Sequence, residues 1–178
     1  RKKAEAYLEY LGKHDVLTQL RNRAFYAEEL NRLTRKGPWP LSIIAIDLNG
    51  LKVVNDEQGH AAGDSMLRRV GEVLAKAVDA PACAARIGGD EFVAVVPGAN
   101  MNAAVKMAED LVSNLYRDYE VSTGKLRLSA SVGVVLYPED GETAGGPENG
   151  RKLEAYEFFL RLGKRLIAAL GEMAIQAL

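Results

Sequence analysis

The sequence is poor in several features, and each scarcity excludes a class of protein. A single cysteine, Cys83, rules out a disulfide within the chain, and its apolar surroundings predict a small core side chain in a reducing compartment. No apolar run approaches the length of a membrane span, and no signal peptide is visible. We therefore expect a cytoplasmic protein that makes no membrane contact through this sequence.

Net charge is also nearly absent, because 23 basic side chains are balanced by 24 acidic ones and leave a formal charge of −1. A nucleic-acid-binding surface dominated by Lys and Arg is not expected from this balance. With 178 residues, 48% of them hydrophobic, the chain can form one globular domain with a real core and a helical appendage.

The two ends of the chain carry helical patterns of their own. Residues 1–13 are charged with a narrow apolar stripe, which predicts a linker or signalling helix from an upstream domain and is compatible with a coiled coil. The sequence begins inside this pattern and without Met, so we expect it to be an excised piece of a longer chain. Residues 141–178 predict a loop and an amphipathic C-terminal helix that packs on or extends the domain.

Between these ends, residues 14–140 alternate strand and helix patterns. Asn22 is a good N-cap for a helix that carries Phe25 and ends near Gly37. The apolar run at 41–46 predicts a strand covered on both faces, which ends on Asp47. A short helix and then a helix over 61–78 follow, with Asp64 in the first turn of the longer one.

Residues 82–96 predict a β-hairpin. Two apolar runs are separated by Gly88 and Gly89, which can take the positive φ that a tight reversal needs. Asp90 and Glu91 follow at the tip. Taken alone, they fit a solvated acidic turn as well as they fit a site where a cation compensates their charge.

A further helix over about 102–119 and a strand over 126–136 complete the pattern. The resulting order, β-α-α-β-β-α-β, matches the split-βαβ, ferredoxin-like arrangement of the α+β class, a sheet with helices on one face.

This arrangement predicts that three acidic side chains lie near one another. The first strand lies beside the hairpin in such a sheet, so Asp47 can approach Asp90 and Glu91. Carboxylates without a His or Cys cluster suit Mg²⁺ or Mn²⁺, and a two-metal site activates a hydroxyl and steadies a leaving pyrophosphate.

The residues after the first strand could hold a nucleotide. The turn at 50–52 can offer backbone N–H groups to phosphates, and Lys52 adds a positive charge, although a loop lysine is usually only solvated. Asn55 and Asp64 together could read a guanine edge. In isolation, Asp64 fits a helix-dipole role about as well.

Four motifs resemble one known family. Arg-Ile-Gly-Gly-Asp-Glu-Phe at 86–92 resembles the signature of the GGDEF family, the diguanylate cyclases, and residues 15–23 are similar to its opening motif. Residues 47–64 follow its strand-one pattern, and Ser-Val-Gly-Val at 131–134 resembles a later strand. The resemblance covers roughly residues 10 to 140.

The resemblance implies an activity and a set of site residues. It implies that two GTP molecules condense into cyclic di-GMP with release of pyrophosphate, by metal-assisted in-line attack of a 3′-hydroxyl on an α-phosphate across a homodimer. The implied ligands of Mg²⁺ or Mn²⁺ are Asp47, the backbone of Leu48 or Ile46, Asp90 and Glu91. The implied catalytic residues are Asp90, Glu91 and Lys52, and the implied substrate-binding residues are Gly50, Leu51, Lys52, Asn55, Asp64 and Arg86.

The sequence departs from the family pattern in three places. The window of the Arg-x-x-Asp product-inhibition motif reads Asp-Ala-Pro-Ala at 79–82, so we expect that site to be absent. Asn49 replaces a commonly acidic residue. Beyond Pro138 the expected phosphate-clamp lysine is missing from its place, which leaves Lys164 or Arg165 to replace it. The alternative is therefore a degenerate domain that binds GTP or a protein partner without turnover.

Overall fold

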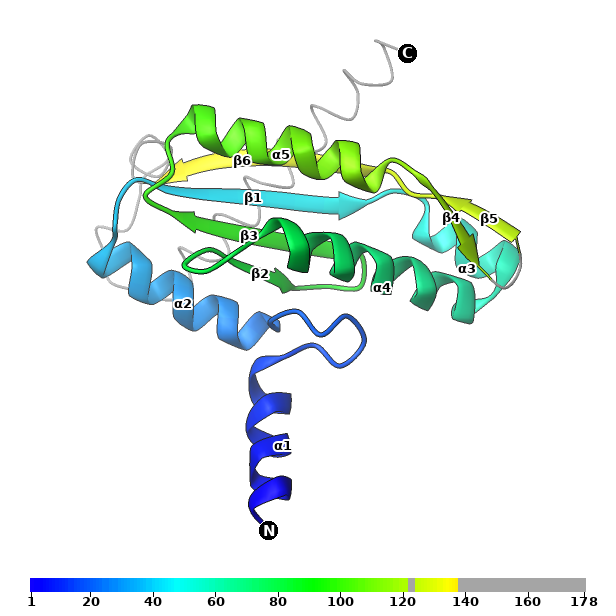
Figure 1. The fold of residues 1–178 in the computed structure, drawn as a ribbon, viewed down its shortest axis with the longest axis horizontal. Coiled ribbons are helices and arrows are strands. Elements are labelled where there is room, and N and C mark those ends of the chain that lie inside the picture. The colour runs from blue at the N-terminus through cyan, green and yellow to red at the C-terminus, as the bar shows by residue number, and fades with distance from the viewer. Residues whose placement is uncertain (122–123, 138–178) are drawn as a thin grey trace.

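The computed structural model describes residues 1–121 and 124–137 (Figure 1). The elements are α1 (Lys2–Lys13), α2 (Arg23–Lys36), β1 (Leu41–Leu48), α3 (Leu51–Gln58), α4 (His60–Ala77), β2 (Cys83–Arg86), β3 (Glu91–Pro97), α5 (Met101–Leu115), β4 (Asp118–Val121), β5 (Gly124–Arg127) and β6 (Ala130–Tyr137). The expected C-terminal helix, with Lys164 and Arg165, lies outside the described residues.

The central layer is a four-stranded antiparallel sheet in the order β2-β3-β1-β6. Its inner strand β1 is the continuous apolar run of the sequence, and most of its residues are buried. The predicted hairpin is β2 and β3, in which Ala85 pairs with Val93 and Arg86 with Phe92. The α+β class is confirmed, and so is the predicted order of strands and helices from β1 to α5.

Helices cover both faces of this sheet, whereas we expected them on one face. On one face, α4 and α5 pack Val70, Leu74 and Leu111 against Ile44 and Ile46. The other face carries a second cluster, in which α2 packs on β1, β2, β3 and β6; it consists of Tyr26, Leu30, Leu33, Leu41, Ile43, Ala85, Val93, Val95 and Val135. Because β1 is apolar at nearly every position, both of its faces need such cover.

The second half of the predicted sequence pattern needs correction. The helix expected to reach Tyr119 ends at Leu115, and the expected single strand from 126 is divided into β5 and β6. Strands β4 and β5 form a separate hairpin, which lies between α5 and β6 in the chain. Tyr119 continues the helical spacing of Leu111 and Leu115, which explains the error. Instead, its hydroxyl donates to the Asn114 carbonyl at 3.0 Å and satisfies one of the free carbonyls at the helix end.

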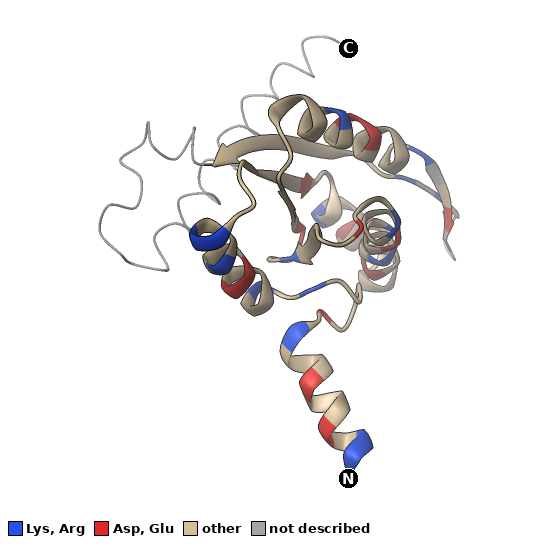
Figure 2. Cartoon of the chain, turned by 60° about the vertical axis from the view of Figure 1, so that its left-hand side comes forward, with Lys and Arg blue, Asp and Glu red and all other residues tan. Residues whose placement is uncertain are grey.

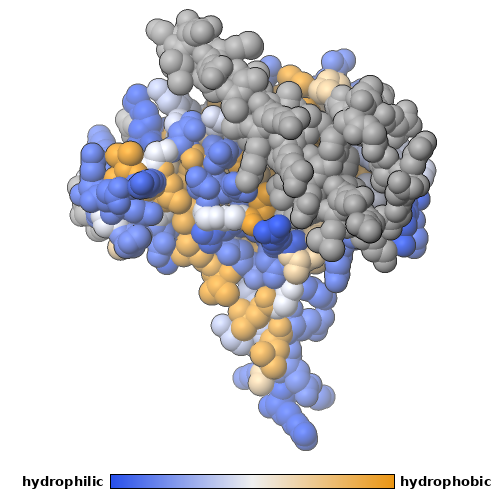
Figure 3. All heavy atoms as spheres, turned by 180° about the vertical axis from the view of Figure 1, so that it is seen from behind, coloured by the Kyte–Doolittle hydropathy of each residue, from blue (hydrophilic) through white to orange (hydrophobic). Residues whose placement is uncertain are grey.

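Helix α1 projects away from the domain and buries none of its residues (Figure 1). Its apolar stripe is exposed: Tyr7 retains 59% and Leu8 66% of their accessible surface, and Figure 3 shows apolar side chains along this helix. Acidic and basic residues are interspersed along α1 and α2 (Figure 2). In the part of the chain that the structure describes, no helix is long and apolar enough to cross a membrane.

Helix α2 begins and ends as the sequence predicts. The Asn22 side chain accepts a hydrogen bond from the Phe25 backbone N–H at 2.9 Å, and Gly37 ends the helix with φ +67°. The buried aromatic residue of this helix is Tyr26, however, and Phe25 is only half-buried with the Arg21 guanidinium 4.3 Å above its ring.

The two neighbouring aromatic residues therefore give a matched test of the second core cluster. We expect Tyr26→Ala to lower the free energy of unfolding by about 3 kcal/mol or more, because it leaves a cavity between α2 and the sheet. Phe25→Ala should cost less than half as much. Urea unfolding followed by circular dichroism measures both, and equal losses would contradict this assignment of the core.

Candidate active site

The register between β1 and β3 brings two predicted carboxylates together. Asp47, the next-to-last residue of β1, lies directly opposite Glu91, the first residue of β3. On its other side, Asp47 lies opposite Ser131 of β6. The Leu48 N–H donates to the Asp90 carbonyl at 2.9 Å. The end of β1 is therefore bonded to the turn at 87–90 between β2 and β3, which we call the signature turn. The prediction that the first strand lies beside the acidic hairpin is confirmed.

This placement sets the carboxylates of Asp47 and Glu91 on neighbouring strands. Residues directly opposite on antiparallel strands share a face with their Cβ atoms roughly 5 Å apart, and like charges there destabilise the pair. Both carboxylate residues are half-buried, and Oδ1 of Asp47 is shielded from solvent. A cation near this edge would offset that repulsion.

The donor set fits a hard divalent cation. Its side-chain donors are carboxylate oxygens, which Mg²⁺ and Mn²⁺ prefer. Among residues 1–121 and 124–137, no group of three or more His, Cys, Asp or Glu side chains is gathered as a metal site. Mg²⁺ is commonly held by one or two carboxylates completed by substrate phosphates, and the Asp47 edge fits that kind of site.

The signature turn is fixed by its own hydrogen bonds. The Ile87 and Gly88 N–H groups both donate to the Glu91 carbonyl, at 2.9 and 3.3 Å. Neither Gly88 nor Gly89 has the positive φ that we expected. A Cβ at Gly88 would lie 3.2 Å from Oε2 of Glu91, a tight contact with that carboxylate, whereas one at Gly89 would meet open space.

The Arg86 side chain donates hydrogen bonds to two carbonyls of this turn. Its Nε donates to the Gly88 carbonyl at 3.1 Å, and its Nη2 donates to the Gly89 carbonyl at 2.9 Å. Its Nη1 lies 3.3 Å from Oδ1 of Asp15 in an ion pair whose side chains are 17% and 21% exposed. These contacts give Arg86 a positioning role in the turn, and its expected role in substrate binding stays a prediction.

Asp15 is a residue whose role sequence reasoning missed, although it opens a recognised motif. Its Oδ2 accepts hydrogen bonds from the Thr18 N–H at 2.9 Å and from the Thr18 hydroxyl at 2.7 Å. Burial alone would raise the pKa of the Asp15 carboxyl, but the Thr18 bonds and the Arg86 charge outweigh it and lower the pKa. The Asp-x-x-Thr spacing was the available signal, because such a pair closes a local turn.

The predicted nucleotide residues lie on α3 and α4, directly after β1. Gly50 caps α3 with φ +78°, and the first N–H groups of α3 follow at Leu51 and Lys52. Asn55 lies against Gly63 of α4, since a Cβ built on Gly63 would be 1.8 Å from Oδ1 of Asn55. α4 begins at His60, so Asp64 lies just beyond its first turn and not within it as expected.

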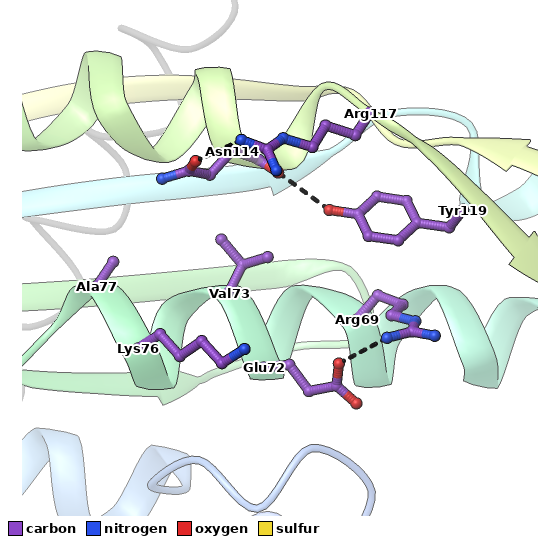
Figure 4. A pocket seen from close by; sticks show the side chains of 8 residues that line it. All are labelled: Arg69, Glu72, Val73, Lys76, Ala77, Asn114, Arg117 and Tyr119. Carbon is purple, nitrogen blue, oxygen red and sulfur yellow. Dashed lines mark hydrogen bonds and ion pairs between the residues drawn. The ribbon is translucent and has the colours of Figure 1, made fainter.

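A hollow of about 360 Å³ lies elsewhere, between α4 on one side and the end of α5 with the residues that follow it on the other (Figure 4). Its lining residues are Arg69, Glu72, Val73, Lys76, Ala77, Asn114, Arg117 and Tyr119. A second hollow of about 340 Å³ lies between the segment from His14 to Glu29 and the segment from Ala75 to Ala84. None of the predicted site residues lines either hollow.

Comparisons with known proteins agree with this arrangement. A family model described as "Diguanylate cyclase, GGDEF domain" matches residues 12–146. The chain is similar to the bifunctional diguanylate cyclase/cyclic di-GMP phosphodiesterase MucR of Pseudomonas aeruginosa, with 37% identity over 144 residues. This alignment covers 79% of the chain but 21% of the relative, so the chain spans about a fifth of that protein's length.

Solved structures share the fold. A sensory box/GGDEF family protein from Caulobacter crescentus matches with a TM-score of 0.72 and 34% identity, covering 90% of this chain and 99% of that one. The coiled coil and GGDEF domain of DgcB from the same species, in complex with c-di-GMP, matches with a TM-score of 0.71 and 25% identity, covering 76% and 74%.

The Asp15 contacts predict a pH-dependent loss of stability. A carboxylate whose pKa is lowered by folding stabilises the fold above its unfolded pKa of about 3.9, and this contribution is lost as the pH falls through the lower folded value. We expect Asp15→Asn to cost about 2 kcal/mol of unfolding free energy at pH 7, because charge-assisted bonds are lost. The gap to the unsubstituted chain should narrow as the pH falls from about 5 toward 3.

Urea unfolding across this pH range measures the gap, and Asp110→Asn, at an exposed position of α5, is the control. A gap that stays constant with pH would contradict the assignment.

Proposed function

The chain belongs to the GGDEF family of diguanylate cyclase domains, and on that premise we propose that it condenses two GTP molecules into cyclic di-GMP with release of pyrophosphate. The observation that carries the proposal is the pairing of Asp47 with Glu91 across β1 and β3, with the Asp90 backbone bonded to Leu48. This arrangement supports an acidic edge where a triphosphate and its metal ions can be held.

Asp47, Asp90 and Glu91, with the backbone carbonyl of Leu48 or Ile46, would hold Mg²⁺ or Mn²⁺. When bound, the cation makes a 3′-hydroxyl a better nucleophile and neutralises charge on the phosphate oxygens. Glu91 lies at the same edge and is suited to accept the 3′-hydroxyl proton. Arg86 keeps the signature turn in place through its bonds to the Gly88 and Gly89 carbonyls.

The residues of α3 and α4 are proposed to hold the rest of the nucleotide. The N-terminus of α3, at Gly50 and Leu51, offers N–H groups to the phosphates, and exposed Lys52 adds a positive charge. Asn55 and Asp64 would read the guanine edge through an amide and a carboxylate.

The reaction joins two nucleotides, so we propose that two copies meet face to face, each holding one GTP. The exposed apolar stripe of α1 supports pairing of that helix between copies. The similar DgcB structure contains a coiled coil next to its GGDEF domain. An upstream sensor domain would then act through this helix.

The carboxylates give a direct test of the enzyme. We expect the chain to convert GTP into cyclic di-GMP in Mg²⁺ buffer, and Asp90→Ala or Asp47→Asn to reduce the rate by about 100-fold or more while the fold persists. Asp110→Asn is the matched control with normal rate. Chromatography of the nucleotides measures product, and circular dichroism verifies folding.

Two outcomes would contradict the proposal. Full activity of Asp90→Ala would exclude the metal assignment. GTP binding without any product, even at high protein concentration, would favour the alternative, a degenerate domain that binds nucleotide without turnover.

The loop before β2 predicts a lack of feedback through the family's inhibition motif. Asp79 and Ala82 occupy the window of the Arg-x-x-Asp motif, so micromolar cyclic di-GMP should not slow the initial rate through that site. The double variant D79R/A82D rebuilds the motif and should gain inhibition by added product. Initial rates with and without cyclic di-GMP measure this, and strong inhibition of the unsubstituted chain would contradict it.

A further inference from the structure

Gly63 in α4 leaves no room for a side chain. A Cβ built there would lie 1.8 Å from Oδ1 and 2.8 Å from Cγ of Asn55, and 3.3 Å from Cδ1 of Leu51. Asn55 and Leu51 are four residues apart in α3, so they share one face of that helix. The space that Gly63 leaves open is therefore filled by the Asn55 amide.

This niche lies where the short helix α3 packs against α4. The helix has eight residues and none of them is fully buried. Leu51 and Val54 are partly buried against the main core, and the α3 face with Asn55 rests on α4. Gly63 immediately precedes Asp64, so the same contact sets Asn55 against the segment that carries the second proposed guanine-reading residue.

The atoms that a new side chain would meet decide what would give way. At Gly63 the obstacle is mainly the end of the Asn55 side chain, which can rotate to another rotamer without moving the backbone. At Gly71 in the same helix, a Cβ would meet the Cβ and the backbone oxygen of Thr18, each at 2.9 Å. A substitution at Gly71 must shift backbone, whereas one at Gly63 displaces Asn55.

We propose that Gly63 is a positioning residue for guanine recognition: the absence of a side chain there forms the niche that holds the Asn55 amide in its reading position. This inference rests on the proposed function, in which Asn55 and Asp64 read the base. It gives Gly63 a specificity role distinct from helix packing, since alanine is otherwise the better helix former.

The test compares Gly63→Ala with Gly71→Ala, Asn55→Ala and the double variant N55A/G63A, all in the 178-residue chain. The ligand is 3′-deoxy-GTP, which cannot react because it lacks the attacking hydroxyl, with 3′-deoxy-ATP as the base control. Calorimetry measures the Kd, thermal unfolding measures stability, and the Asn55 side-chain amide resonance, identified by its loss in Asn55→Ala, reports its position.

We expect Gly63→Ala to keep or raise the Tm, to shift the Asn55 resonance, and to weaken 3′-deoxy-GTP binding by about 3- to 10-fold with lower preference over the adenine analogue. Gly71→Ala should lower the Tm and leave the Asn55 resonance in place. N55A/G63A should bind no more weakly than Asn55→Ala. Gly12→Ala, where a Cβ meets open space, is the neutral control for affinity.

Two results distinguish a failure of the Gly63 proposal from a failure of the proposed function. If the Asn55 resonance and the guanine preference are unchanged in Gly63→Ala while Asn55→Ala weakens binding, the positioning role is excluded and the proposed function stands. If the unsubstituted chain does not bind the guanine analogue, or Asn55→Ala binds it normally, the guanine-reading part of the proposed function is contradicted and the role of Gly63 in it falls as well.

Discussion

The candidate site depends on the antiparallel register between β1 and β3. Because side chains alternate along a strand, a slip of one residue would turn Asp47 to the opposite face and separate it from Glu91. The apolar residues of β1 prevent such a slip, since two core clusters claim its two faces. The packing of hydrophobic side chains thus holds two like charges opposite each other, in an arrangement that they would not adopt alone.

Beside the strand register, the charged side chain of Arg86 fixes the signature turn. The signature turn has no strained glycine, and its carbonyls at Gly88 and Gly89 are held by the Arg86 guanidinium. Arg86 is in turn paired with Asp15, in the segment that follows α1. The turn is therefore tied to the segment that joins α1 to α2. A displacement of that segment would act on the turn through this ion pair and through the backbone hydrogen bonds of Arg21 with Ala84 and Arg86.

Sequence reasoning was most successful where one signal dominated. The uninterrupted apolar run of β1, the Gly-Gly pair between two apolar runs and the split-βαβ order together placed Asp47 beside the hairpin. It failed at Tyr119, because the spacing of this residue from Leu111 and Leu115 fits a helix. The chain has already left α5 at that point and entered β4. It also missed roles that exist only in three dimensions: the Asp15 ion pair joins residues 71 positions apart, and the Gly63 niche is formed by a side chain from another helix.

The two halves of the site are held by different forces, and this has a consequence for how they can change. The carboxylate edge is fixed by backbone hydrogen bonds within a sheet, so the placement of its residues depends little on any one side chain. In the proposed base-reading half, Asn55 lies against Gly63 of another helix, and we expect one added methyl group there to displace the Asn55 amide while the backbone stays in place. Base selectivity should therefore be the more easily altered property, since it can change without disturbing the edge where the phosphates react.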